Sequence, residues 1–99
     1  MPAEIPAQVV ASAGLFAVLG HAGRLHTLLL LSERQPRTAG ELSEATGLEQ
    51  TSMSHQLRLL REARLVKAHR EGRHVYYRLA DEHVAQIVRD AGAHVLEVG

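Results

Sequence analysis

Residues 39–63 read AGELSEATGLEQTSMSHQLRLLREA, and the first part of this stretch predicts a short, capped helix. Thr38 stands just before it and Glu41 follows three residues later, which is the spacing of a capping box. The box predicts a helix over residues 39–46. Gly47 ends that helix, because glycine readily adopts the left-handed conformation found after helix C-termini.

The second part predicts a longer amphipathic helix that starts near Thr51 or Ser52 and carries Met53, Leu57 and Leu60 on its inner face. Helix, short glycine turn, helix is the layout of a helix-turn-helix, whose second helix enters the major groove of DNA. A plain two-helix hairpin would give the same pattern. Hydroxyl, amide and basic side chains suit contacts to bases and phosphates. The candidate DNA contacts on this helix are Gln50, Thr51, Ser52, Ser54, His55, Gln56 and Arg58.

A β-hairpin is predicted directly after the second helix. Residues 65–69 (LVKAH) and 74–79 (HVYYRL) are rich in strand formers, and residues 70–73 between them contain a glycine suited to a tight turn. This hairpin, residues 65–79, would form a wing beside the helix-turn-helix. Arg70 and Arg73 at its tip are placed to contact backbone phosphates.

Composition favours a single, mainly α-helical domain spanning residues 1–99, with a small β-hairpin. Apolar residues make up 45% of the chain but aromatic residues only 3%, so the core must consist of aliphatic side chains. Helical spacing predicts two further helices, over residues 8–19 and 22–34, and a last helix over 82–98. We expect residues 1–7 to be loosely ordered. The absence of cysteine excludes disulfides and thiolate metal ligands.

Charge is distributed unevenly although the net charge is zero. Residues 58–78 carry seven basic and two acidic residues, so this segment has an excess of five positive charges and the rest an equal negative excess. Such a basic segment fits a polyanion, although it also fits a solvated surface. No apolar run approaches the roughly 20 residues that span a bilayer. We therefore expect a cytoplasmic protein that binds no membrane, and the charge distribution alone leaves DNA binding and a solvated surface both open.

Four residues of metal-binding types lie along the predicted last helix or at its start: Asp81, His83, His94 and Glu97. The two histidines are eleven positions apart in the sequence, so at about 100° per residue they return to within roughly 20° of one face. A rise of about 1.5 Å per residue puts them roughly 16 Å apart, whereas a metal holds nitrogen ligands at about 2 Å. One ion cannot bind both histidines of one chain. Two antiparallel copies would instead bring His83 of one beside His94 of the other.

This spacing predicts a metal site that forms only in a homodimer. Two nitrogen and two oxygen ligands suit tetrahedral zinc, and the same set with added water suits octahedral nickel or cobalt. Each residue also has an interpretation that does not involve a metal ion. Asp81 fits a helix N-cap, and the other three fit a solvated helix face.

Three segments resemble the ArsR/SmtB family of bacterial metal-responsive repressors. They are LGHAGRLHTLLLL at 19–31, ELSEATGLEQTSMSHQLRLLREARLV at 41–66 and REGRHVYYRLADEHV at 70–84. The resemblance implies a winged helix-turn-helix that forms a homodimer through its first and last helices. The family pattern is Asp-x-His, ten residues, then His-x-x-Glu or His-x-x-His, and Asp81, His83, His94 and Glu97 resemble it here. It implies a regulatory site between the last helices of two subunits.

We therefore expect a homodimeric repressor that binds a palindromic operator when metal-free and releases it when metal binds. An alternative is a regulator of the same fold that is controlled by a protein partner rather than by its own metal site. An enzyme is not expected. No recognisable nucleophile and base accompany the candidate ligands, which disfavours a metal-dependent hydrolase.

Overall fold

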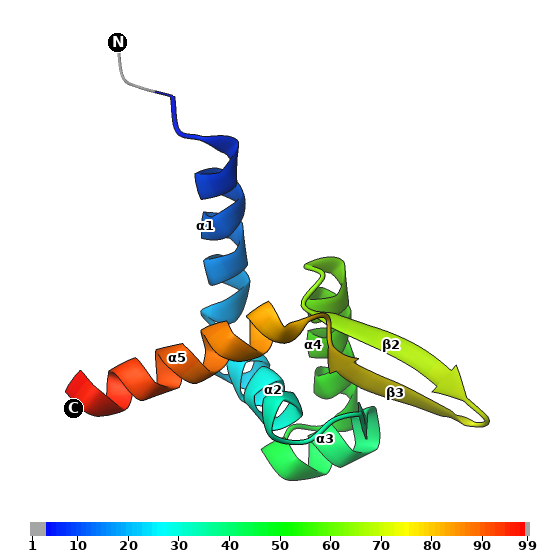
Figure 1. Ribbon diagram of the computed structural model, residues 1–99. Helices are drawn as coiled ribbons and strands as arrows, with labels where there is room; N and C mark the ends of the chain where they lie inside the picture. Colours follow the sequence, from blue (N-terminus) through cyan, green and yellow to red (C-terminus); the bar gives the residue numbers. More distant parts are fainter. Residues whose placement is uncertain (1–3, 99) are drawn as a thin grey trace.

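The computed structural model describes residues 4–98 as a mainly helical fold with a small antiparallel sheet (Figure 1). This confirms the predicted fold class. Its helices are α1 (Ala7–Leu19), α2 (Ala22–Glu33), α3 (Ala39–Thr46), α4 (Gln50–Glu62) and α5 (Glu82–Val98), and its strands are β1 (Arg37–Thr38), β2 (Val66–Glu71) and β3 (His74–Leu79). Part of the segment expected to be loosely ordered lies outside the described residues, and Ala7 already belongs to α1.

The two helices of residues 39–63 form as their sequence predicts. Thr38 Oγ1 accepts a hydrogen bond from the Glu41 backbone N–H at 3.1 Å, and the Glu41 carboxylate accepts one from the Thr38 N–H at 3.0 Å. This capping box starts α3, and Gly47 ends it with a φ of 78°. Helix α4 begins at Gln50, slightly earlier than the predicted start, and the loop before it is short.

The sheet has the strand order β1-β3-β2, with both pairs antiparallel. Strand β2 extends to Glu71, so the hairpin turn consists only of Gly72 and Arg73, with Gly72 at a φ of 64°. A glycine at the first position of a two-residue turn suits the twist of a hairpin. Strand β1 was not predicted. It has two residues, and Arg37 pairs with the distant Tyr77.

An aliphatic core lies where α2, α3 and α4 meet. Leu28 and Leu31 of α2 and Leu42 of α3 are fully buried there. Met53, Leu57 and Leu60 supply the buried face of α4, as predicted. Strand β3 and the first turns of α5 close the core with Leu79, Val84, Ala85 and Val88. The core therefore fixes α4 and the hairpin in one rigid unit.

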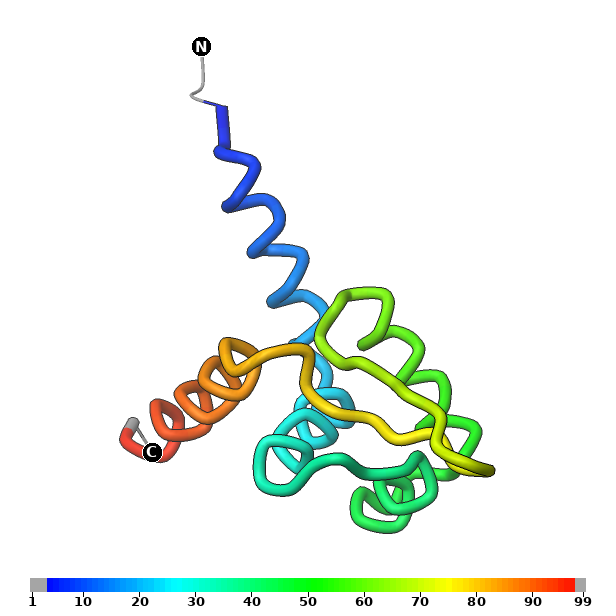
Figure 2. The backbone as a smooth tube through the Cα atoms, turned by 45° about the vertical axis from the view of Figure 1, so that its right-hand side comes forward, coloured from blue at the N-terminus to red at the C-terminus, as the bar shows by residue number. Residues whose placement is uncertain are grey.

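Helix α1 projects from this unit, and only its last two turns pack against it (Figures 1 and 2). Val9, Val10 and Phe16 expose more than half of their surface, and α1 contains no charged residue. Helix α5 extends away in another direction and exposes Val95 and Leu96 near its end. Within residues 4–98 no single helix is long and apolar enough to cross a membrane. Helices α1 and α2 reach that length only together, and a 94° bend separates them.

Candidate nucleic-acid interface and metal ligands

Helix α4 presents a polar stripe on the side opposite its buried leucines. Thr51, Ser54, His55 and Arg58 follow one another at helical spacing and line one shallow hollow. His55 Nδ1 and Arg58 Nη2 lie 3.0 Å apart, so the arginine is held along the stripe. The stripe offers hydroxyl, imidazole and guanidinium groups, which can contact base edges and phosphates.

The remaining candidates on α4 occupy different environments. Gln50 and Ser52 are exposed in the first turn. Gln56 is half-buried, and its Oε1 accepts a hydrogen bond from Arg24 Nη1 at 3.0 Å. Its carbonyl oxygen is therefore directed to Arg24, and its amide nitrogen can still donate to an outside partner. The sequence pattern gave no signal for this contact, because the two residues lie 32 positions apart.

The wing carries most of its charge near its outer end and along one face. Arg70 and Arg73 are both exposed at the tip, where the chain turns. Lys67 and Arg78 lie directly opposite each other on neighbouring strands. Like charges in such a pair repel, so this pair costs stability unless an anion lies nearby. The hairpin therefore presents a concentrated positive surface.

Two histidines and a tyrosine stabilise the outer face of the wing. The rings of His69 and Tyr76 stack across the strands with centroids 5.7 Å apart, and His74 meets Tyr76 edge-on at 6.2 Å. His69 also lies 3.7 Å from the carboxylate of Glu71. These side chains stiffen the hairpin because cross-strand aromatic pairs are favourable.

The four candidate metal ligands fall into two pairs at opposite ends of α5. Asp81 Oδ1 accepts a hydrogen bond from the Val84 N–H at 3.1 Å, so Asp81 caps the helix. The same oxygen lies 3.7 Å from His83 Nδ1, and the His83 side chain is 94% exposed. His94 and Glu97 are exposed in the last turns of the helix. Each chain thus presents two half-sets of ligands.

One chain does not bring these half-sets together. Among residues 4–98, no three histidine, aspartate, glutamate or cysteine side chains are arranged to hold an ion. The chemistry of the donors nevertheless fits zinc, nickel or cobalt, since exposed imidazoles and carboxylates are their usual ligands without cysteine. Asp81 caps the helix through one carboxylate oxygen, which leaves the other for a different partner.

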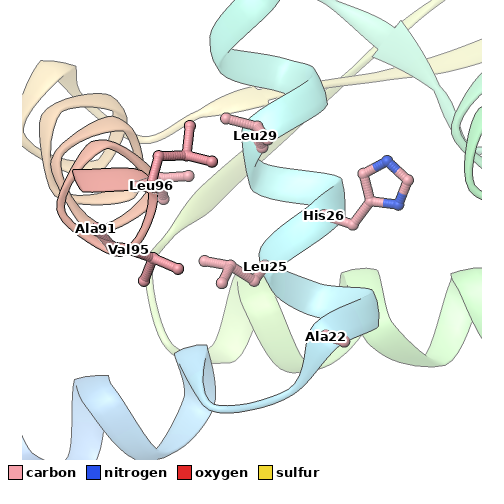
Figure 3. Close-up of a pocket in the computed structure, with 9 residues that line it drawn as sticks. Ala22, Leu25, His26, Leu29, Ala91, Val95 and Leu96 are labelled. Atoms are coloured by element: carbon pink, nitrogen blue, oxygen red, sulfur yellow. The ribbon is translucent and has the colours of Figure 1, made fainter. Parts of the chain in front are cut away.

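An apolar groove lies between α2 and α5, beside the second pair of ligands. Leu25 and Leu29 of α2 face Ala91, Val95 and Leu96 of α5 across it (Figure 3). The imidazole of His26 points away from the groove in the same view. The groove is thus lined almost entirely by carbon atoms.

The α3-turn-α4 pair, with its polar stripe and the basic hairpin behind it, defines a protein of the winged helix-turn-helix class, whose members bind DNA. Residues 21–68 match the family described as "Bacterial regulatory protein, arsR family". The chain belongs to this family of bacterial transcriptional regulators, which are not enzymes.

Curated relatives support this assignment. The chain is 41% identical over 85 residues to the "Transcriptional repressor SmtB homolog" of Synechocystis, covering 86% of this chain and 64% of that protein. It is also 41% identical over 97 residues to the "HTH-type transcriptional repressor SmtB" of Mycobacterium tuberculosis, covering 97% and 71%. The chain thus spans about two thirds of the length of these relatives.

Solved structures agree with the fold. The "homodimeric winged helix-turn-helix DNA-binding domain" of Mycobacterium bovis Mb0332 superposes with a TM-score of 0.81 at 30% identity, covering 98% of this chain and 92% of that one. The "AntR antimony-specific transcriptional repressor" superposes with a TM-score of 0.85 at 26% identity, covering 99% and 88%.

Proposed function

We propose that this protein is a homodimeric transcriptional repressor whose binding to operator DNA is controlled by a divalent metal ion, zinc or nickel or cobalt. The observation that carries the proposal is the division of the ligands between the two ends of α5. Asp81 and His83 lie at one end and His94 and Glu97 at the other, on a helix that also exposes apolar residues. A helix of this kind serves as both a dimer contact and a shared metal site.

The apolar surface supports a second copy of the chain as the partner. Helix α1 exposes Val9, Val10 and Phe16, and the groove between α2 and α5 exposes Val95 and Leu96. Patches of this kind on a small domain are usually covered in an assembly. A related structure is described as homodimeric. The proposed dimer therefore pairs through its first and last helices.

In such a dimer, Asp81 and His83 of one subunit would hold the ion together with the partner's His94 and Glu97. The ion supplies a bridge between two helices. Asp81 keeps its role as helix cap, so the first turn of α5 is ordered before metal binds. One related repressor is described as antimony-specific, which supports an inorganic effector for this fold.

DNA contact would use the polar stripe of α4 in the major groove and the tip of the wing on the backbone. The candidate contacts are Gln50, Thr51, Ser52, Ser54, His55, Gln56, Arg58, Arg70 and Arg73. Two copies of α4 must lie about one helical turn of DNA apart, so their separation depends on the dimer. A metal that favours one dimer arrangement changes operator affinity by its differential affinity for the two arrangements.

The direct test is operator affinity with and without metal. Duplexes selected by the protein from a random library supply the operator, and fluorescence anisotropy measures its dissociation constant in chelator, zinc, nickel and cobalt. We expect at least one metal to weaken binding by about 5- to 150-fold, the usual range of allosteric coupling. His83→Ala and His94→Ala should remove the effect, whereas His26→Ala on α2 should keep it.

An unchanged operator affinity with every metal would contradict metal control. DNA binding without a metal response would then favour the alternative, a regulator of the same fold controlled by a protein partner.

A further inference from the structure

Arg24, at the start of α2, makes hydrogen bonds to α1 and to α4, the helix proposed to contact DNA. Its Nε donates a hydrogen bond to the carbonyl oxygen of Val18 in the last turn of α1 at 2.6 Å. Its Nη1 donates to the side-chain oxygen of Gln56 on α4 at 3.0 Å. Its backbone N–H donates to His21 Nδ1, which caps α2. One arginine therefore joins three helices.

The hydrogen bond from Arg24 to α1 pairs a carbonyl group at the C-terminal end of that helix. The last four carbonyl groups of a helix have no partner within the helix, and a cation near them is favourable. The Gly20 N–H donates a hydrogen bond to the carbonyl oxygen of Phe16, and Arg24 donates one to the carbonyl oxygen of Val18. Arg24 thus supplies the C-terminal cap of a helix that has no basic residue in its own last turn.

Little else ties α1 to α4. A surface hollow lies between them, lined by Ala17 and Val18 of α1 and by Leu59 and Glu62 of α4, with Arg24 also lining it. Helix α1 packs on the body only through Leu15 and the residues of its last turn, and its remaining length projects outward (Figure 2). The guanidinium group of Arg24 therefore provides a direct polar link between α1 and α4, beside the apolar packing of Leu15, Val18 and Leu19.

We propose that Arg24 is a positioning residue that fixes α1 against α4 and so transmits the arrangement of the dimer to the DNA-reading helix. A planar guanidinium suits this role, because its donors point in fixed directions and can serve two acceptors at once. Gln56 then acts as the receiving group on α4 rather than solely as a DNA contact. The claim that Arg24 transmits the dimer arrangement is the regulatory part, and it rests on the proposed function. The claim that Arg24 fixes α1 against α4 is the geometric part, and it stands without that function.

The geometric part can be tested without DNA or metal. The chain has no cysteine, so the pair Gln8→Cys on α1 and Arg61→Cys on α4 gives two defined sites for spin labels. Labelled chains are mixed with an excess of unlabelled chains, and pulsed electron resonance measures the distance within one chain. We expect a narrow distribution in the parent protein and a clearly broader one in Gln56→Leu and in Arg24→Leu.

Gln56→Leu is the sharper variant, because it removes only the contact to α4 and leaves the cap of α1 in place. Arg34→Leu is the matched control. Arg34 lies at the other end of α2, and its side chain contacts Glu41 rather than α1 or α4. Circular dichroism confirms that each variant retains its helices. An unbroadened distribution in Gln56→Leu and Arg24→Leu overturns the proposal.

The regulatory part is tested on operator DNA. The readout is the ratio of operator affinity without metal to that with metal, because a merely structural role would lower stability and leave this ratio unchanged. We expect Arg24→Leu to reduce the ratio by about 3- to 30-fold, the range for residues that couple two sites. An unchanged ratio overturns the proposal. A parent protein without any metal response would instead contradict the proposed function and leave the distance test to decide the role of Arg24.

Discussion

Glu41 is the residue whose ionisation bears most directly on the stability of the helix-turn-helix. The Thr38 backbone N–H donates to its carboxylate, and this bond, helped by the Thr38 side chain and by Arg34, holds the pKa of Glu41 below its ordinary value of 4.5. A lowered pKa in the folded state stabilises the fold above the unfolded pKa. That contribution disappears as the pH falls through the lower, folded value.

We therefore expect Glu41→Gln to cost about 0.5 kcal/mol near neutral pH, a modest amount because the Glu41 side chain is 44% exposed to solvent. The difference in the free energy of unfolding between the parent and the variant should shrink as the pH falls below the ordinary pKa of glutamate. Urea unfolding at fixed protein concentration, across an acidic pH series, measures it. A difference that stays constant over this range would contradict the assignment.

Arg64 takes an unusual backbone conformation at the end of α4. Its φ is 62°, and it is the only residue other than glycine with a positive φ among the described residues. Its N–H donates to the Arg61 carbonyl, and the Leu65 N–H donates to the Leu60 carbonyl, both at 2.9 Å. This is the Schellman arrangement, in which the position held here by Arg64 is usually glycine.

We predict that Arg64→Gly raises the free energy of unfolding by about 0.5–1 kcal/mol, because it relieves the cost of a left-handed side-chain-bearing residue. Arg64→Ala should give almost no gain, since alanine keeps the Cβ atom. Thermal unfolding of the three proteins at one concentration checks this. Equal gains for glycine and alanine would assign the effect to the lost charge instead.

How far single residues could be predicted depended on the range of their contacts. The capping box of Thr38 and Glu41 was predicted, because it spans three residues and needs only local geometry. The bond from Arg24 to Gln56 was not, because it joins positions 32 residues apart. The positive φ of Arg64 could not be predicted from the sequence either, since arginine does not favour the left-handed conformation.

At the scale of elements, the salt dependence of DNA affinity tests whether the basic tip of the wing contacts phosphates. Arg70 and Arg73 are exposed there, and a homodimer carries two such wings. Affinity falls as salt rises, and each lost phosphate contact makes the slope of log affinity against log salt less steep by about 1. Arg70→Ala or Arg73→Ala should therefore reduce the steepness by about 2 per dimer. Anisotropy titrations at several salt concentrations measure the slope.

Arg89→Ala is the control for this prediction. Arg89 lies on α5 and pairs with Glu82 at 2.7 Å, so its loss should leave the salt slope unchanged. If the tip variants also left the slope unchanged, phosphate contact would have to come from the face that carries Lys67 and Arg78.

Elements with a strong periodic or turn signal were predicted close to their observed ends, as α3, α4 and the hairpin illustrate. Strand β1 was missed because its two residues, Arg37 and Thr38, show no alternation and gain their strand character by pairing with β3. The candidate metal ligands were identified from residue type and spacing alone. Their assembly stays a prediction, because it depends on a second chain.

At the scale of the whole molecule, we predict that a charge placed on the apolar surface dissociates the proposed dimer. Phe16→Asp and Val95→Asp alter residues that are 61% and 67% exposed in one chain. Each should raise the dimer dissociation constant by roughly 100-fold or more, because an unpaired carboxylate would be buried. Sedimentation velocity measures this. Ser54→Asp adds the same charge on α4 and should leave the dimer intact.

The proposed metal site between two subunits predicts complementation between two defective chains. His83→Ala and His94→Ala homodimers should each lose tight metal binding. A mixed dimer keeps one complete site, made by the intact His83 of one chain and the intact His94 of the other. Calorimetric titration of refolded mixtures should recover about one ion per mixed dimer. No recovery would contradict a site that takes His83 from one chain and His94 from the other.

Helix α1 also has a consequence for which chains can pair. Across Ala7–Leu19 no side chain carries a charge, so the helix offers no repulsion against a wrong partner. Selective pairing generally needs such repulsive features as well as attractive ones. At α1, a bacterium that makes several related regulators would have to separate them by the shape of apolar contacts, and only α5 could add charge to the discrimination. Where that discrimination is weak, heterodimers would form, and each would recognise an operator with two unlike halves.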